Sequence, residues 1–173
     1  MSKHQTISDI TQRYTIMNIE FIVVGKTDMR EVEALVDMYS KRINRYVRFA
    51  TTTIADVRNT KKLSVVEQKR IEGEAIMRQL TDTDYVMLLD EHGMELRSIE
   101  FADLMQRRMA SGTKRLVFII GGPYGFSDAL YQRADAKLSL SKMTFSHQIV
   151  RAIFTEQLYR AFTIINHEPY HHE

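Results

Sequence analysis

Apolar and polar positions along the chain recur with two periods, one typical of strands and one typical of helices. Short β-branched and aromatic runs predict strands at Ile19–Val24, Tyr46–Ala55, Tyr85–Leu89, Arg115–Ile120 and Lys137–Leu140. Apolar residues at helical spacing predict helices at Asp28–Asn44, Ser64–Leu80, Ser98–Ala110, Ser127–Arg133 and Ser146–Asn166. This alternation indicates an α/β fold, with a parallel sheet and helices on both faces.

Individual residues mark the ends of these elements. Ser64, Ser98 and Ser127 are expected to cap helices, because serine is a favoured N-cap residue. The segment Asp90–Gly93 follows a nearly continuous apolar run and predicts a turn after a buried strand. The apolar stripe of the last helix is typical of a core or interface face, so its Arg151 and Arg160 are expected to be solvated or ion-paired.

Length and composition are those of an ordinary globular domain, with 173 residues, 44% hydrophobic and 27% charged. A single domain is expected over residues 17–173, and the polar residues 1–16 are interpreted as a disordered extension, an expression remnant or an upstream start. The absence of cysteine excludes disulfides and thiolate chemistry, and it fits a cytoplasmic protein. The longest apolar run, Leu116–Ile120, is far too short to span a membrane.

Basic charge is concentrated in the first part of the chain. The net charge is +2, and basic residues interleave with aromatic ones between Tyr39 and Phe49. The basic members are Lys41, Arg42, Arg45 and Arg48, followed by Arg58, Lys61 and Lys62. Such a patch suits RNA phosphates and unstacked bases, but a solvated helix end explains it as well, so it supports RNA binding only beside another indication.

Three segments follow strand ends and are the places where a ligand is expected, because ligands of parallel sheets bind at the carboxyl ends of the strands. They are Leu89–Gly93, Gly121–Ser127 and Leu140–His147. The glycine spacing of the second matches neither a dinucleotide fingerprint nor a P-loop, which disfavours nicotinamide and nucleoside-triphosphate sites. A simple Gly-rich turn, and simple capping by Thr144 or Ser146, are alternative interpretations.

The C-terminal tail combines three histidines, a tyrosine and two glutamates within its last eight residues, which is unusual for a chain end. A metal site is not expected there, because Pro169 between His167 and His171 opposes a helix. The spacing also differs from H-E-x-x-H. His147, at the start of the last helix, is a candidate base or simply a surface residue.

Several motifs together resemble one known family. They are Leu88–Asp90, Ile119–Ser127, Leu138–Thr144, Glu156–Ala161 and the terminal Pro169–His171. In this order and at these separations, the chain is similar to the RlmH family of SPOUT-superfamily enzymes. Members of that family methylate N3 of a pseudouridine in the helix 69 stem-loop of bacterial 23S ribosomal RNA. The resemblance covers about residues 17–173.

The resemblance implies a single SPOUT-type domain whose C-terminal part forms a deep trefoil knot. It also implies a homodimer that acts on ribosomal RNA or the ribosome and uses S-adenosylmethionine. By matching motif, the cofactor contacts are Leu89, Gly121, Leu140, Ser141, Lys142, Met143, Thr144 and Phe145. The family's target-nucleotide residues correspond to His147, Arg151, Arg160, Tyr170 and His171, with the tail completing a site shared by two subunits.

Two positions depart from the family pattern. Ser146 stands where the family has proline, and His172 stands where it has arginine or lysine. The second difference matters for charge, since arginine is always cationic and histidine is mostly neutral near pH 7.

The expected reaction transfers a methyl group from a sulfonium to a ring nitrogen. The acceptor N3–H must lose its proton, to solvent or to His147 or His171. Arg151 or Arg160 could stabilise negative charge on the ring oxygen or hold a phosphate. Two other functions fit the same sequence: a non-catalytic RNA-binding or ribosome-associated protein, and an α/β enzyme that uses another nucleotide cofactor.

Overall fold

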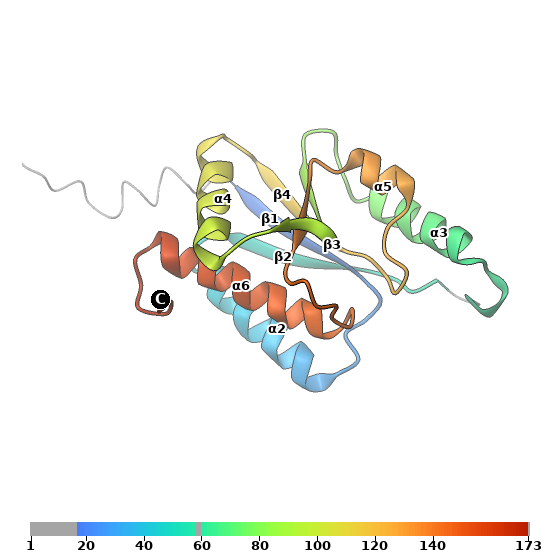
Figure 1. The fold of residues 1–173 in the computed structure, drawn as a ribbon, viewed down its shortest axis with the longest axis horizontal. Helices are drawn as coiled ribbons and strands as arrows, with labels where there is room; N and C mark the ends of the chain where they lie inside the picture. Colours follow the sequence, from blue (N-terminus) through green and yellow to red (C-terminus); the bar gives the residue numbers. More distant parts are fainter. Residues whose placement is uncertain (1–16, 58–59, 173) are drawn as a thin grey trace, which may run out of the picture.

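The protein is described here by a computed structural model, which covers residues 17–57 and 60–172; the expected extension over residues 1–16 lies outside this range. The elements are β1 (Asn18–Val24), α2 (Arg30–Ile43), β2 (Arg48–Ile54), η1 (Thr60–Lys62), α3 (Val65–Met77), β3 (Tyr85–Glu95), α4 (Ser98–Ala110), β4 (Arg115–Ile120), α5 (Asp128–Arg133), β5 (Ala136–Ser139) and α6 (Ile149–Ile165). All strand pairs are parallel, in the order β2-β1-β4-β3-β5 (Figure 1). The predicted α/β architecture is confirmed.

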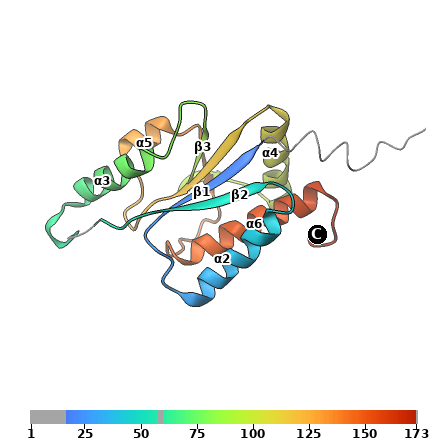
Figure 2. The same ribbon diagram turned by 180° about the vertical axis from the view of Figure 1, so that it is seen from behind.

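Helices cover both faces of the sheet, as Figures 1 and 2 show from opposite sides. Alternate strand residues point to opposite faces, so Phe21 packs with α2, α4 and α6, while its neighbour Ile22 packs with α3 and α5. On the first face the ring centroid of Phe154, in α6, lies 4.7 Å from the ring centroids of both Phe21 and Phe118. Each of these fully buried side chains stabilises the fold by about 2–3 kcal/mol.

The turn predicted at Asp90–Gly93 is wrong, because β3 continues to Glu95. Its register against β5 shifts between Leu89 and Met94, both of which pair with Leu138. The four residues between them therefore bulge out of the ladder and then return to it. Gly93 permits this, since a Cβ at this position would lie 2.6 Å from backbone atoms of Lys137 and Leu138.

Gly93→Ala is accordingly expected to lower the free energy of unfolding by about 3 kcal/mol, because β5 backbone must move to admit a methyl group. Urea denaturation followed by circular dichroism measures the loss. Gly112→Ala is the comparison: its φ of 77° is strained for alanine, but the space around it is open, so a loss of about 1 kcal/mol is expected. Equal losses at the two positions would contradict the close approach of β5.

Two predicted helix starts also need correction. Ser98 is the first residue of α4 rather than its cap, and its hydroxyl donates to Gln157 Oε1 of α6 at 3.0 Å. The last helix is assigned from Ile149 instead of Ser146, and the Gln148 side chain just before it bonds Lys26 O and the Asp28 amide. Ser64 and Ser127 do cap α3 and α5, as predicted.

A tight turn after α6 sends the tail back along the helix. The amides of His167 and Glu168 donate to the carbonyls of Ile164 and Thr163, which is the Schellman pattern. His167 takes the left-handed position of this motif, with φ 56°. The turn directs Tyr170 and His171 toward α6 instead of away from the domain.

Candidate active site

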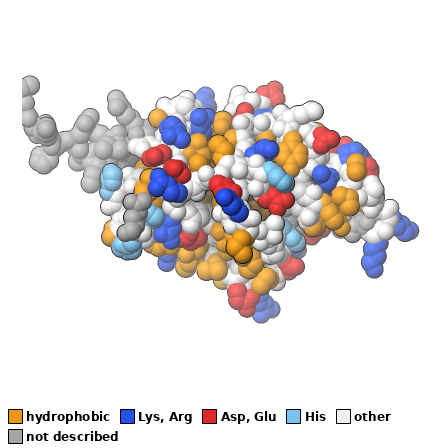
Figure 3. All heavy atoms as spheres, viewed as in Figure 1, with side chains coloured by type: hydrophobic (Ala, Val, Ile, Leu, Met, Phe, Trp, Pro, Cys, Tyr) orange, Lys and Arg blue, Asp and Glu red, His pale blue; other side chains and the backbone are white. Residues whose placement is uncertain are grey.

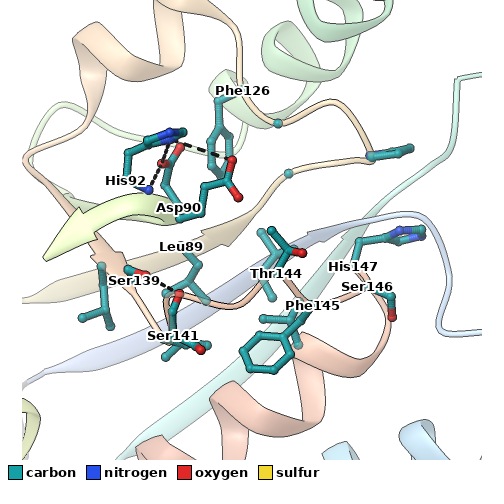
Figure 4. Close-up of a pocket in the computed structure, with 18 of the residues that line it drawn as sticks. Leu89, Asp90, His92, Phe126, Ser139, Ser141, Thr144, Phe145, Ser146 and His147 are labelled. Carbon is teal, nitrogen blue, oxygen red and sulfur yellow. Dashed lines mark hydrogen bonds and ion pairs between the residues drawn. The ribbon is translucent and has the colours of Figure 1, made fainter. Parts of the chain in front are cut away.

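A pocket of about 610 Å³ opens at the carboxyl edge of the sheet. The three predicted segments converge on it: the β3 bulge, the glycine loop after β4 and the segment between β5 and α6 (Figure 4). Seven of the eight predicted cofactor residues line it, namely Leu89, Gly121, Leu140, Ser141, Met143, Thr144 and Phe145. The exception is Lys142, whose side chain is 84% exposed and lies 3.8 Å from Glu95.

Hydroxyl groups shape the segment between β5 and α6. Ser139 donates to the carbonyl of Ser141, whose own hydroxyl accepts from the Met143 amide, both at 2.9 Å. Ser146 accepts from the Ile149 amide at 3.2 Å, so the capping interpretation holds for this residue. The Met143 and Phe145 side chains remain exposed at the pocket, where apolar groups are available to a ligand.

Asp90 and Tyr131 also line the pocket, and the sequence motifs did not single them out as site residues. The Tyr131 hydroxyl of α5 donates to Asp90 Oδ2 at 2.5 Å, and the His92 amide donates to Oδ1 at 2.8 Å. Burial alone would raise the pKa of Asp90, but these hydrogen bonds outweigh it and lower the pKa. Asp90 is thus a hydrogen-bonded carboxylate in the pocket wall. In the sequence, only its position directly after a buried apolar run indicated that it could belong to the site.

Arg151 is buried, and the expectation that it is solvated or ion-paired is wrong. It is 1% exposed and donates to the carbonyls of Val24, Gly25 and His147 and to Thr27 Oγ1, at 2.6–3.0 Å. Burial lowers the pKa of its guanidinium, and Asp28 and Asp56 oppose this effect. Arg151 therefore ties the end of β1 to the segment that carries His147, and His147 itself lines the pocket.

The other predicted nucleotide-handling residues lie together on α6 and the tail. Glu156 Oε1 accepts from Arg160 Nη2 at 2.5 Å and from the Tyr170 hydroxyl at 3.0 Å. The Arg160 guanidinium lies over the Tyr170 ring, with Nη1 3.4 Å from His171 Nδ1. Burial, Tyr39 and Glu156 all raise the pKa of Tyr170, so this phenol stays protonated at neutral pH.

The structure separates this tail cluster (Glu156, Arg160, Tyr170 and His171) from the pocket. His147 precedes α6, whereas Arg160 lies in its second half, and a helix rises about 1.5 Å per residue. The two groups are thus about 20 Å apart along the helix axis. None of the tail cluster lines the pocket of its own chain.

The aromatic residues of the basic patch serve helix packing. Tyr46 stacks on Phe162 and donates to Glu168 at 2.6 Å, while Arg42 lies over the rings of Tyr39 and Tyr159. Phe49 is buried, and Arg58 lies outside the described residues. On the face shown in Figure 3, lysines and arginines are interspersed with acidic side chains.

Two kinds of site are absent from the described ranges, residues 17–57 and 60–172. Within them no three or more histidine, aspartate or glutamate side chains are grouped as a metal site would require. Within the same ranges, no helix has the length and hydropathy of a membrane span.

Residues 17–171 match the family described as "Predicted SPOUT methyltransferase", and the chain belongs to that family. A crystal structure titled as a probable methyltransferase from Bordetella pertussis Tohama I shares the fold, with a TM-score of 0.51 and 11% identity over 89% of this chain and 98% of that one.

Much more similar relatives carry the name Ribosomal RNA large subunit methyltransferase H. The protein from Christiangramia forsetii is 54% identical over 90% of this chain and 99% of its own length. Those from Flavobacterium psychrophilum and Bacteroides thetaiotaomicron are 53% and 52% identical, each over 91% of this chain and all of the relative. The resemblance to the RlmH family is confirmed.

Proposed function

We propose that this protein is an S-adenosylmethionine-dependent methyltransferase of large-subunit ribosomal RNA, acting in the cytoplasm on N3 of a pseudouridine in the helix 69 stem-loop. The observation that carries the proposal is the convergence of three distant segments on one pocket. They do so in a chain of the SPOUT family that is 50–54% identical to relatives with the name given above.

The pocket suits a cofactor of this kind. Its volume of about 610 Å³ lies in the range of small-molecule sites, and its lining mixes apolar side chains with hydroxyls and backbone groups. Gly121 lets the glycine loop pack closely on itself at the pocket, since a Cβ there would lie 3.0 Å from Gly125 O and 3.1 Å from the Phe126 ring. Leu89, Leu140 and Met143 would hold the apolar parts, and S-adenosylmethionine would supply the activated methyl group.

The chain's own residues would align the acceptor and manage its proton. His147 at the pocket and His171 on the tail are the candidate bases for the N3 proton. Arg160 is the candidate cation for the ring oxygen or a phosphate, since Glu156 orients its guanidinium at 2.5 Å. Arg151 would act indirectly, because its donors are engaged with β1 carbonyls, Thr27 and His147.

The active form is proposed to be a homodimer in which the tail of one chain completes the pocket of the other. The separation of about 20 Å between the tail cluster and the pocket of the same chain supports this arrangement. The ordered tail offers Tyr170 and His171 on a fixed surface of α6, as a shared site would need.

The C-terminal part is proposed to be threaded as a deep trefoil knot. In support, β5 pairs with β3 at one edge of the sheet, yet the next helix, α6, packs beside α2 and α4 (Figure 1). The segment that makes this passage, residues 140–148, also supplies one wall of the pocket.

Two measurements test the proposed function. Calorimetric titration with S-adenosylmethionine and with its demethylated product is expected to show one site per chain. Labelled S-adenosylmethionine is then expected to transfer its methyl group to ribosomes that lack the modification, at one position of the large-subunit RNA. RNA binding with a steep salt dependence but no transfer would instead identify a non-catalytic binding protein. Preference for a nicotinamide or flavin would indicate another enzyme.

A further inference from the structure

A buried carboxyl group that the reaction described so far does not use lies behind the pocket. Glu72 of α3 is 4% exposed, and its Oε1 accepts from Gln68 Nε2 at 2.9 Å. Its other oxygen, Oε2, is buried without a hydrogen-bond partner in the part of the chain that the structure describes. An unpaired buried polar atom costs about 1–3 kcal/mol, so this carboxyl group destabilises the fold where it stands.

Glu72 lies directly against the glycine loop. A Cβ built on Gly122 would be 2.5 Å from Glu72 Oε2 and 2.9 Å from Oε1, so the carboxyl group occupies the space behind this residue. The next residue of α3, Gly73, packs in the same close way on the Ser127 hydroxyl. Helix α3 thus supports the loop at two points, Gly122 and Ser127, and the loop between them is a wall of the pocket.

Groups on two other segments also influence this carboxyl group. Burial raises the pKa of Glu72, and Asp56, which follows β2, raises it further. The hydrogen bond from Gln68 and the charge interaction with His147 both lower it. A glutamine would fill the same space without the cost of a buried charge.

We propose that Glu72 is a positioning residue of the methyl-transfer site: its carboxyl group, packed against Gly122, fixes this wall of the pocket. The inference rests on the proposed function, since it assigns the residue to that pocket. Glu72 does not line the pocket, so it acts through Gly122 and touches no ligand.

The contact is tested by exchanging side-chain volume between the two positions. The Cβ of Gly122→Ala points at Glu72, so the clash displaces the carboxyl group from the loop that it supports, and S-adenosylmethionine affinity is expected to fall about tenfold. Glu72→Ala removes the support and is also expected to weaken binding. The double variant is expected to bind no more weakly than Glu72→Ala alone, because the clash is gone. If the two losses of S-adenosylmethionine affinity multiply in the double variant, Glu72 and Gly122 act independently and the proposed contact is wrong.

The surroundings of the Glu72 carboxyl group are tested on the protein without cofactor. Carbon-13 NMR of the Glu72 carboxyl is expected to show a higher pKa in His147→Gln than in the wild type, because the interaction with His147 that lowers it is removed. An unchanged pKa would overturn the charge interaction. These measurements need no activity, so an enzyme that fails to methylate RNA would refute the proposed function and leave this inference to stand or fall on the binding and stability measurements.

Stability against pH gives an independent check on the ionisation of Glu72. Folding raises this pKa, so the group's contribution to stability is fully present below the ordinary glutamate pKa and is lost as pH rises through the folded value. Glu72→Gln removes that loss, so its melting temperature is expected to exceed the wild-type value more at about pH 8 than at about pH 5. A pH-independent difference for Glu72→Gln would contradict a buried ionisable group.

Discussion

His171→Ala is expected to slow methyl transfer by about 10²–10⁴-fold, the usual contribution of a positioned acid or base. S-adenosylmethionine affinity is expected to stay near the wild-type value, because His171 lies against Arg160 and not in the pocket of its own chain. Single-turnover kinetics and calorimetry separate the two effects. His172→Ala changes an exposed neighbour and is expected to leave the rate close to wild type. A loss of S-adenosylmethionine affinity in His171→Ala would show that this residue binds the cofactor and that the role proposed for it is wrong.

Mixed dimers test whether the site is shared. His171→Ala keeps its pocket, and Gly121→Val keeps its tail but distorts the glycine loop that walls the pocket, since even a Cβ at residue 121 would meet Gly125 O at 3.0 Å. Each variant alone is expected to be inactive. After random exchange of subunits, half of the dimers hold both variants, and each of these has one intact shared site, so activity should return to about a quarter of wild type. No recovery would show that pocket and tail act within one chain.

Arg151→Ala is expected to lower the free energy of unfolding by about 3–5 kcal/mol, the largest stability effect that we predict. The change leaves the carbonyls of Val24 and Gly25 without their buried donor and opens a cavity beneath the segment that carries His147. Chemical denaturation measures the loss.

Two further variants define the cause of that loss. Arg151→Lys is not expected to restore stability, because one ammonium group cannot reach all the acceptors that the planar guanidinium spans. Arg45→Ala removes an exposed arginine and is expected to change stability by less than about 0.5 kcal/mol. Full stability in Arg151→Lys would show that a single charge, and not the network, is what the site needs.

These expectations combine a family resemblance with positions that only the structure supplies. The motifs identified His171, Arg160 and Tyr170 as a group, and the structure shows how Glu156 and the turn at His167 hold them. The motifs also grouped Arg151 with them, but its bonds assign it to the support of the pocket segment. Spacing along a helix does not show that the long Arg151 side chain is buried and reaches the carbonyls of Val24 and Gly25 at the end of β1.

By itself, the sequence determined the order of strands and helices, the parallel α/β class and the three segments that form the pocket. These features follow from local periodicity and from the rule that parallel strands end at one edge. Only the tertiary structure decided the course of β3 beyond Leu89, the burial of Arg151 and the contact of Glu72 with Gly122. Each of these depends on contacts between residues far apart in the chain, and such contacts leave no period in the sequence.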